Sequence, residues 1–195
     1  QGGVILFAPP GAGKSFIAII KATIIATGHP HESKVPQLWK VPSPRQVLYV
    51  NLERSPESMR RRANMVMTAL GYKNLASPVA FLNARGKRFI DVRKKISGFV
   101  KQYPGAIVFV DSLSRMGVGG SMTTDDVANS AADLLNSTCP TWYAIGHTPR
   151  QDATHIFGSV LYDAAEDVGI QLSSDESQPN TLGIALKKVG FHRYS

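Results

Sequence analysis

The amino-acid sequence predicts an α/β fold in which a mostly parallel sheet is covered by helices on both faces. Short apolar runs of strand length alternate with longer segments of helical period, which is the pattern of a buried parallel sheet. Two stretches that show neither period, residues 28–45 with four prolines and residues 114–123 with three glycines, are predicted loops. No repeat or break in composition divides the chain, so we expect residues 1–195 to form one domain.

Seven segments have the character of buried strands, because β-branched and aromatic residues gather in them between turn-forming residues. They cover residues 4–8, 46–52, 79–82, 106–111, 141–146, 167–172 and 181–186. Helices are predicted between them. Residues 55–57 are an N-cap serine, a first-turn proline and a first-turn acid, and the helix that they open ends at Gly71. Two further helices are predicted over residues 87–103 and 124–136.

Composition excludes several classes of protein. The chain has 195 residues, of which 43% are hydrophobic, so it can bury a core without disulfides. Its single cysteine, Cys139, cannot form an internal bridge, and no Cys/His cluster has the spacing of a zinc site. The longest apolar stretch, residues 16–26, is shorter than the roughly 20 residues of a membrane-spanning helix. We expect a cytoplasmic protein with no membrane segment.

The sequence begins with Gln1, and an apolar strand follows almost at once, so no signal peptide fits. We expect the chain to be part of a longer protein. Its net charge of +8 is unevenly spread, because residues 31–102 carry 15 basic and 4 acidic side chains whereas residues 103–180 carry 2 and 10. Such asymmetry accompanies nucleic-acid binding, a charged subunit interface or solvated helix faces.

A glycine-containing segment between the first strand and a helical run has the pattern of a phosphate-binding P-loop. Its two glycines let backbone amides point at phosphate groups, while a lysine and a serine hydroxyl suit phosphate oxygens and Mg²⁺. The residues that we expect to contact a nucleotide are Pro10, Gly11, Ala12, Gly13, Lys14, Ser15 and Phe16.

Carboxylates at the ends of two other strands can complete this site. Asp111 closes the apolar run 106–111, so Ser15 and Asp111 are the predicted Mg²⁺ ligands, directly or through a water. No acid follows Asp111, so the carboxylate that activates water must come from another strand. Glu53 follows the strand 46–52 at the edge where such sheets bind ligands, and it is the predicted catalytic base.

His147 and Thr148 follow the strand 141–146 and are predicted to reach the same edge of the sheet. Either side chain can hydrogen-bond a γ-phosphate or the attacking water, which would let it report hydrolysis. His147 is therefore grouped with Lys14 and Glu53 as a predicted catalytic residue.

Four blocks of the sequence resemble the RecA-like superfamily of P-loop ATPases, in particular an AAA-domain subgroup similar to plasmid RepA-type hexameric replicative helicases. The blocks are residues 8–15, 51–56, 107–116 and 146–150, the last followed by residues 157–166. The resemblance implies a twisted RecA-type core, with ATP held between neighbouring subunits of a ring. In it, Glu53 matches the catalytic glutamate, Asp111 the Walker B acid and His147 the sensor.

The resemblance also implies a basic side chain that reaches the γ-phosphate held by the neighbouring subunit. The candidates for this finger, or for a further sensor, are Thr148, Arg150, Lys187, Lys188 and Arg193. Loops that would face nucleic acid, residues 114–123 and 148–158, contain few basic groups. In a ring, the uneven charge has a specific interpretation: a basic face around residues 60–62 and 94–95 meets an acidic face around residues 125–126 or 163–167.

The sequence thus predicts an ATP-hydrolysing motor domain, with ATP and Mg²⁺ as cofactors, coupled to translocation or remodelling of single-stranded nucleic acid. The expected type is a replicative helicase or primase-helicase acting as a homo-oligomeric ring, with a hexamer suspected. ATP is favoured over GTP because no Asn-Lys-x-Asp segment is present. Two alternatives stay open: a RecA-like recombinase or regulatory ATPase that uses ATP as an assembly switch, and a small-molecule kinase, which should need an arginine-rich lid.

Overall fold

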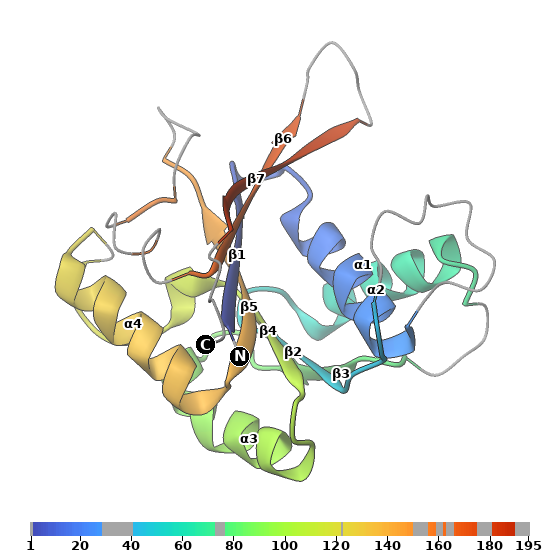
Figure 1. Ribbon diagram of the computed structural model, residues 1–195, viewed down its shortest axis with the longest axis horizontal. Helices are drawn as coiled ribbons and strands as arrows, with labels where there is room; N and C mark the ends of the chain where they lie inside the picture. Colours follow the sequence, from blue (N-terminus) through green and yellow to red (C-terminus); the bar gives the residue numbers. More distant parts are fainter. Residues whose placement is uncertain are drawn as a thin grey trace, which may run out of the picture.

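The computed structural model describes residues 2–28, 41–72, 77–121, 123–149, 156–158, 162, 166–174 and 181–189. Within them, seven strands form one twisted sheet in the order β3-β2-β4-β5-β1-β6-β7 (Figure 1). The strands are β1 (Gly2–Ala8), β2 (Val47–Asn51), β3 (Ala80–Asn83), β4 (Ile107–Asp111), β5 (Thr141–His147), β6 (Val168–Ser174) and β7 (Leu182–Val189). The described helices are α1 (Lys14–Thr27), α2 (Pro56–Ala69), α3 (Phe89–Gln102), α4 (Asp125–Thr138) and the short 3₁₀ helix η1 (Leu113–Arg115).

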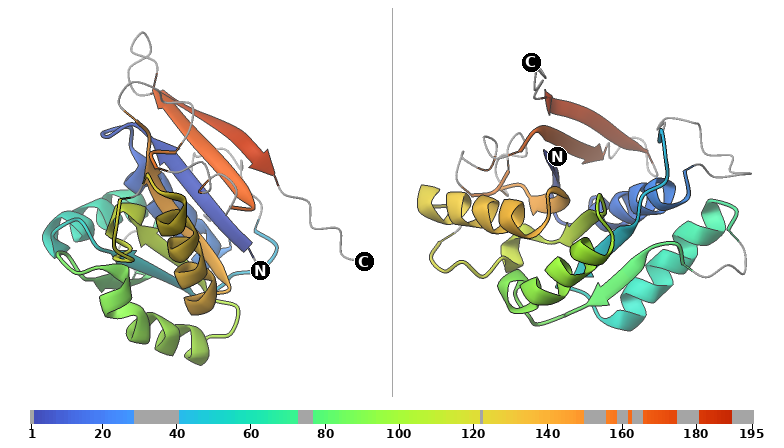
Figure 2. Two further views of the ribbon diagram at one scale, coloured as in Figure 1. Left: turned by 90° about the vertical axis from the view of Figure 1, so that its left-hand side faces the viewer. Right: turned by 60° about the horizontal axis from the view of Figure 1, so that its bottom comes forward.

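The sheet is parallel from β3 to β6, and only its last pair, β6 and β7, is antiparallel. Helices α1 and α2 cover one face, and α3 and α4 cover the other, as the three views together show (Figures 1 and 2). The predicted α/β fold, a mostly parallel sheet with helices on both sides, is confirmed. No helix among the described residues has the length and apolarity needed to span a bilayer.

Alternation along the central strands builds two cores at once. In β1, Ile5 and Phe7 face the α3/α4 side, whereas Leu6 packs among the side chains of α1 and α2. In β4, Val108 and Phe109 divide in the same way. Successive strand residues point to opposite faces, so a strand covered on both sides has to be apolar throughout. This is why the strands could be found as continuous apolar runs.

The predicted element boundaries are close to those observed. Ser55 caps α2 by accepting a hydrogen bond from the Ser58 amide at 3.2 Å, as the sequence indicates. The largest differences lie in the expected loop 114–123, which begins within η1, and at β7, which continues to Val189. Most of the predicted loop 28–45 lies outside the described residues.

Candidate nucleotide-binding site

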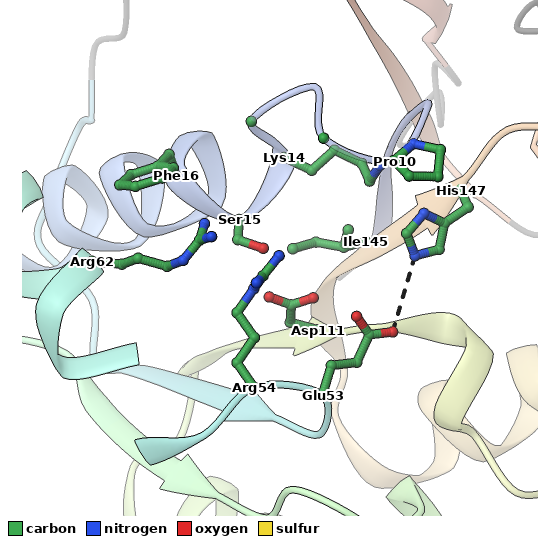
Figure 3. A pocket seen from close by; sticks show the side chains of 12 residues that line it. Pro10, Lys14, Ser15, Phe16, Glu53, Arg54, Arg62, Asp111, Ile145 and His147 are labelled. Carbon is green, nitrogen blue, oxygen red and sulfur yellow. Dashed lines mark ion pairs between the residues drawn. The ribbon is translucent and has the colours of Figure 1, made fainter. Parts of the chain in front are cut away.

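A cavity of about 200 Å³ opens at the carboxyl ends of β1, β2, β4 and β5, beside the start of α1 (Figure 3). It is lined by Pro10, Gly11, Gly13, Lys14, Ser15, Phe16, Glu53, Arg54, Arg62, Asp111, Ile145 and His147. The structure therefore brings together the expected P-loop, both predicted carboxylates and the predicted sensor histidine. Ala12, which we expected to contact the nucleotide, does not line this cavity.

The P-loop turns sharply at its two glycines. Gly11 and Gly13 have φ angles of 87° and 82°, in a left-handed region that side chains with a Cβ rarely adopt. The Lys14 ammonium donates hydrogen bonds to the carbonyl oxygens of Ala8, at 2.7 Å, and Pro9, at 2.8 Å. Burial lowers the pKa of Lys14 to about 8, although Asp111 and Glu53 oppose the shift. A phosphate oxygen can replace these carbonyl acceptors and restore a charge partner to the lysine.

Asp111 and Ser15 meet at the floor of the cavity. Asp111 accepts a hydrogen bond from the Tyr49 hydroxyl at 2.9 Å, and the Ser15 side chain is also bonded to it. Burial raises the pKa of Asp111, and the bonds from Ser15 and Tyr49 act against that rise. Sequence reasoning missed Tyr49, although a tyrosine in a buried strand needs a partner for its hydroxyl.

These oxygen atoms fit Mg²⁺, which prefers hard oxygen ligands and keeps several waters or phosphate oxygens in its shell. Ser15 and Asp111 offer one hydroxyl and one carboxylate in direct contact with each other. In the part of the chain that the structure describes, no group of three or more His, Cys, Asp or Glu side chains could hold a metal ion. A magnesium ion here would thus depend on a bound nucleotide for further ligands.

Glu53 lies two residues beyond β2, facing His147 across the cavity. Its Oε1 atom accepts hydrogen bonds from the hydroxyls of Ser112 and Ser114, the latter at 2.9 Å, and lies 4.0 Å from His147 Nε2. Burial raises the pKa of Glu53, but the two serine hydrogen bonds, His147 and Arg115 outweigh it, so the pKa is below its ordinary value. The carboxylate is therefore ionised near neutral pH and can accept a proton.

His147 lies at the end of β5. Burial lowers its pKa, and Lys14 lowers it further, whereas Glu53 and Asp111 raise it; the net shift is downward, so the imidazole is neutral at physiological pH. Among the described residues, its buried Nδ1 atom has no hydrogen-bond partner. A neutral imidazole can donate from one nitrogen and accept at the other, which suits a group that contacts both water and phosphate.

The expected sensor and finger residues lie in different places. Thr148 is buried and donates its amide to the Ala8 carbonyl at 3.3 Å, but it does not line the cavity. Lys187 and Lys188 lie on β7 and are not part of the lining either. Arg150 and Arg193 fall outside the described residues.

Two arginines in the cavity were not foreseen. Arg62 was expected on a basic outer surface with its neighbours in residues 60–62; instead its guanidinium lies 4.5 Å from the centre of the Phe16 ring and reaches the cavity. The helical period explains the difference, since Arg62 flanks the buried positions Met59 and Ala63. Arg54 follows Glu53 directly, and that adjacency was the only signal for it in the sequence.

Arg54 is fixed by the side chain of Asn51, which is completely buried. Asn51 Oδ1 accepts from the Arg54 amide at 3.0 Å, and its Nδ2 donates to the Arg54 carbonyl at 2.8 Å. The same Nδ2 donates to Asn83 on β3 at 3.0 Å. The Arg54 Nε atom is buried and has no partner among the described residues, so it is ready to donate to an acceptor that enters the cavity.

The charges of the lining match a polyphosphate. Three cationic side chains, those of Lys14, Arg54 and Arg62, face two carboxylates, Glu53 and Asp111. With a neutral His147 the cavity keeps an excess of positive charge, and the amides at the start of α1 add to it.

Comparisons with known proteins agree with this geometry. A family model described as an AAA domain matches residues 1–152. Among solved structures, the ATPase domain of a replicative helicase has a TM-score of 0.68 and 14% sequence identity to this chain, covering 97% of this chain and 77% of that one. A search of curated proteins finds no match. The RecA-like core predicted from the sequence is confirmed by the structural likeness.

Proposed function

Because the chain belongs to the AAA domain family, we propose that it is an ATP-hydrolysing motor domain of the helicase type, acting on single-stranded nucleic acid. One observation carries the proposal: a P-loop lysine and serine, a buried strand-end aspartate and a second, ionised carboxylate share one cavity. This set can bind a nucleoside triphosphate and direct water at its γ-phosphate.

Binding uses the positive side of the cavity. The P-loop amides and Lys14 hold the phosphate chain, while Arg54 and Arg62 add charge from the same subunit. Ser15 and Asp111 would hold Mg²⁺, which when bound neutralises phosphate charge during transfer. Tyr49 keeps the Asp111 carboxylate turned toward Ser15.

Hydrolysis uses the carboxylate side. Glu53 orients a water molecule for in-line attack and takes a proton from it, and its low pKa keeps it available for that task at neutral pH. His147, 4.0 Å from Glu53, is placed to bond the same water or the γ-phosphate, as expected for a sensor. Both groups act by positioning and electrostatics, which carry most of the catalysis in phosphoryl transfer.

We further propose that the motor works as a homo-oligomeric ring, with six members by analogy with the family resemblance, in which a neighbour supplies the finger. The exposed strand β7 supports this, because Lys187 lies there among exposed apolar side chains such as Leu186 and outside its own subunit's cavity. Arg150 and Arg193 stay in the same proposal as alternatives to Lys187 and Lys188.

The experiment is the steady-state ATPase rate of the purified chain, measured over a range of protein concentrations with and without single-stranded DNA. A shared-site motor predicts a specific activity that rises with both. Activity that is independent of concentration and DNA would contradict the motor and favour a self-contained switch or kinase. Sedimentation at low and high salt tests the interface: contact between basic and acidic faces predicts weaker assembly at high salt.

A further inference from the structure

The carboxylate of Glu53 is held by two serine hydroxyls that nucleotide binding does not by itself require. Ser112 and Ser114 both donate to the same oxygen, Oε1, and their own hydroxyl oxygens lie 2.8 Å apart. His147 approaches this oxygen as well. The other carboxylate oxygen, Oε2, is left to serve a ligand in the cavity.

The two serines stand on a rigid turn. Ser112 is completely buried and follows the predicted metal ligand Asp111, so its position is tied to β4. The turn η1 is closed by two backbone hydrogen bonds, from the Arg115 amide to Ser112 at 3.0 Å and from the Met116 amide to Leu113 at 3.2 Å. Leu113 and Met116 are buried in the core beneath it. The hydroxyl pair therefore cannot follow Glu53 if the glutamate turns away.

Glu53, by contrast, has few restraints of its own. It lies beyond the end of β2, is only partly buried, and has a side chain with three rotatable bonds. A hydrogen bond from a rigid hydroxyl to a charged carboxylate is among the stronger ones in proteins. Two such bonds to one oxygen select one orientation of the carboxylate.

We propose that Ser112 and Ser114 are positioning residues for the catalytic glutamate: they fix Oε1 against η1 so that Oε2 faces the attacking water. The inference rests on the proposed function, because it assigns Glu53 as the base. It adds a residue pair that acts through Glu53 without touching the nucleotide. It also makes the stability of η1 depend on the Glu53 side chain.

The first experiment needs no activity. Hydrogen exchange of the Arg115 and Met116 amides is compared in wild type, Glu53→Ala and Glu53→Gln, with Asp133→Ala, an exposed acid on α4, as control. Removing the acceptor should speed exchange at these amides at least about threefold, whereas glutamine keeps an oxygen acceptor and should leave exchange near wild type. Equal exchange in all four proteins would overturn the clamp.

The second experiment separates positioning from structure. Ser114 is exposed, so Ser114→Ala should fold normally; we expect kcat to fall about 3- to 10-fold with KM for ATP within about twofold of wild type. Ser114→Thr retains the hydroxyl and should restore kcat, and the exposed serine variant Ser137→Ala should not change it. In a Glu53→Gln background, Ser114→Ala should cause no further loss.

The outcomes distinguish the two proposals. If wild type hydrolyses ATP in a Glu53-dependent manner and Ser114→Ala and Ser112→Ala both keep full kcat, the positioning role is wrong. A rise in KM matching the fall in kcat would also overturn it, because it indicates damage to the site. If wild type has no ATPase activity but Glu53→Ala still loosens η1, the proposed function fails and the clamp stands.

Discussion

The central strands and the last strand of the same sheet are built on opposite terms. In β1 and β4, side chains of both faces are buried, and the strands end in the P-loop and in Asp111. In β7 nearly every residue is exposed, and Leu186 keeps 65% of its surface in solvent. The centre thus carries chemistry that one subunit can complete, whereas the edge presents apolar and basic groups outward, as a contact surface would.

The largest expected effect tests the structural half of this contrast. Phe109 on β4 is completely buried and stacks on Tyr143, with ring centres 4.7 Å apart. Phe109→Ala should lower the free energy of unfolding by about 3–5 kcal/mol. Leu186→Ala on β7 should change it by less than about 0.5 kcal/mol. Urea denaturation of both variants gives the two values, and similar losses would refute the contrast.

Next in size is the catalytic half. Glu53→Gln should reduce turnover by about 10²-fold or more while ATP binding persists, because glutamine cannot accept the proton. Glu57→Gln, a change at an exposed acid in the first turn of α2, is the matched control and should retain the wild-type rate. Turnover is measured with saturating ATP, and binding with a fluorescent analogue. An active Glu53→Gln variant would remove Glu53 from the mechanism.

A smaller effect is expected from the unforeseen arginine. Arg54→Ala should weaken ATP binding about tenfold, since it removes a charge-assisted donor to the phosphates. Arg61→Ala removes an exposed arginine one residue from the cavity-lining Arg62, so it controls for net charge. Calorimetric titration measures both. Equal affinities in the two variants would show that Arg54 does not contact the nucleotide.

Smaller still is the effect of one hydroxyl. Tyr49→Phe removes the hydrogen bond to Asp111 and should raise the Mg²⁺ concentration needed for half-maximal nucleotide binding about three- to fivefold. Affinity measured without Mg²⁺ should not change. Tyr143→Phe is the control, because the Tyr143 hydroxyl is buried without a hydrogen-bond partner among the described residues. If both tyrosine variants need the same Mg²⁺ concentration as wild type, Tyr49 has no role at the metal site.

The smallest expected effect is an absence of reaction. Cys139 is buried, and this burial raises the pKa of its thiol to about 12, so the native protein should resist labelling by a thiol reagent at pH 8. A cysteine introduced on β7 by Leu186→Cys should react at once. Rapid labelling of Cys139 in folded wild type would mean that the centre opens as readily as the edge.

Much of the fold was visible in the sequence because continuous apolar runs report strands covered on both faces. Asp111 and Glu53 were found as polar residues that follow such runs. The contacts of Tyr49 with Asp111 and of Ser112 with Glu53 were not, because they depend on β2 lying next to β4, with Asn51 opposite Asp111. Strand order is set by tertiary packing, and no local period of the sequence encodes it.

Arg62 shows a second limit. Its neighbours in a run of three arginines gave it the character of a solvated face, and only the rotation of α2 against α1 decides which of the three turns inward. The ring of Phe16, on α1, provides the platform on which its guanidinium rests. Contacts between two helices remote in the sequence therefore set a residue of the site.

The bonds from Lys14 to the carbonyls of Ala8 and Pro9 also have a thermodynamic consequence. Since the lysine already spans its own loop, the arrival of a phosphate exchanges one set of acceptors for another and orders little additional chain. Preorganisation of this kind keeps the entropic penalty of association small, so nucleotide capture should proceed in a single fast kinetic phase without a slow loop-closing step.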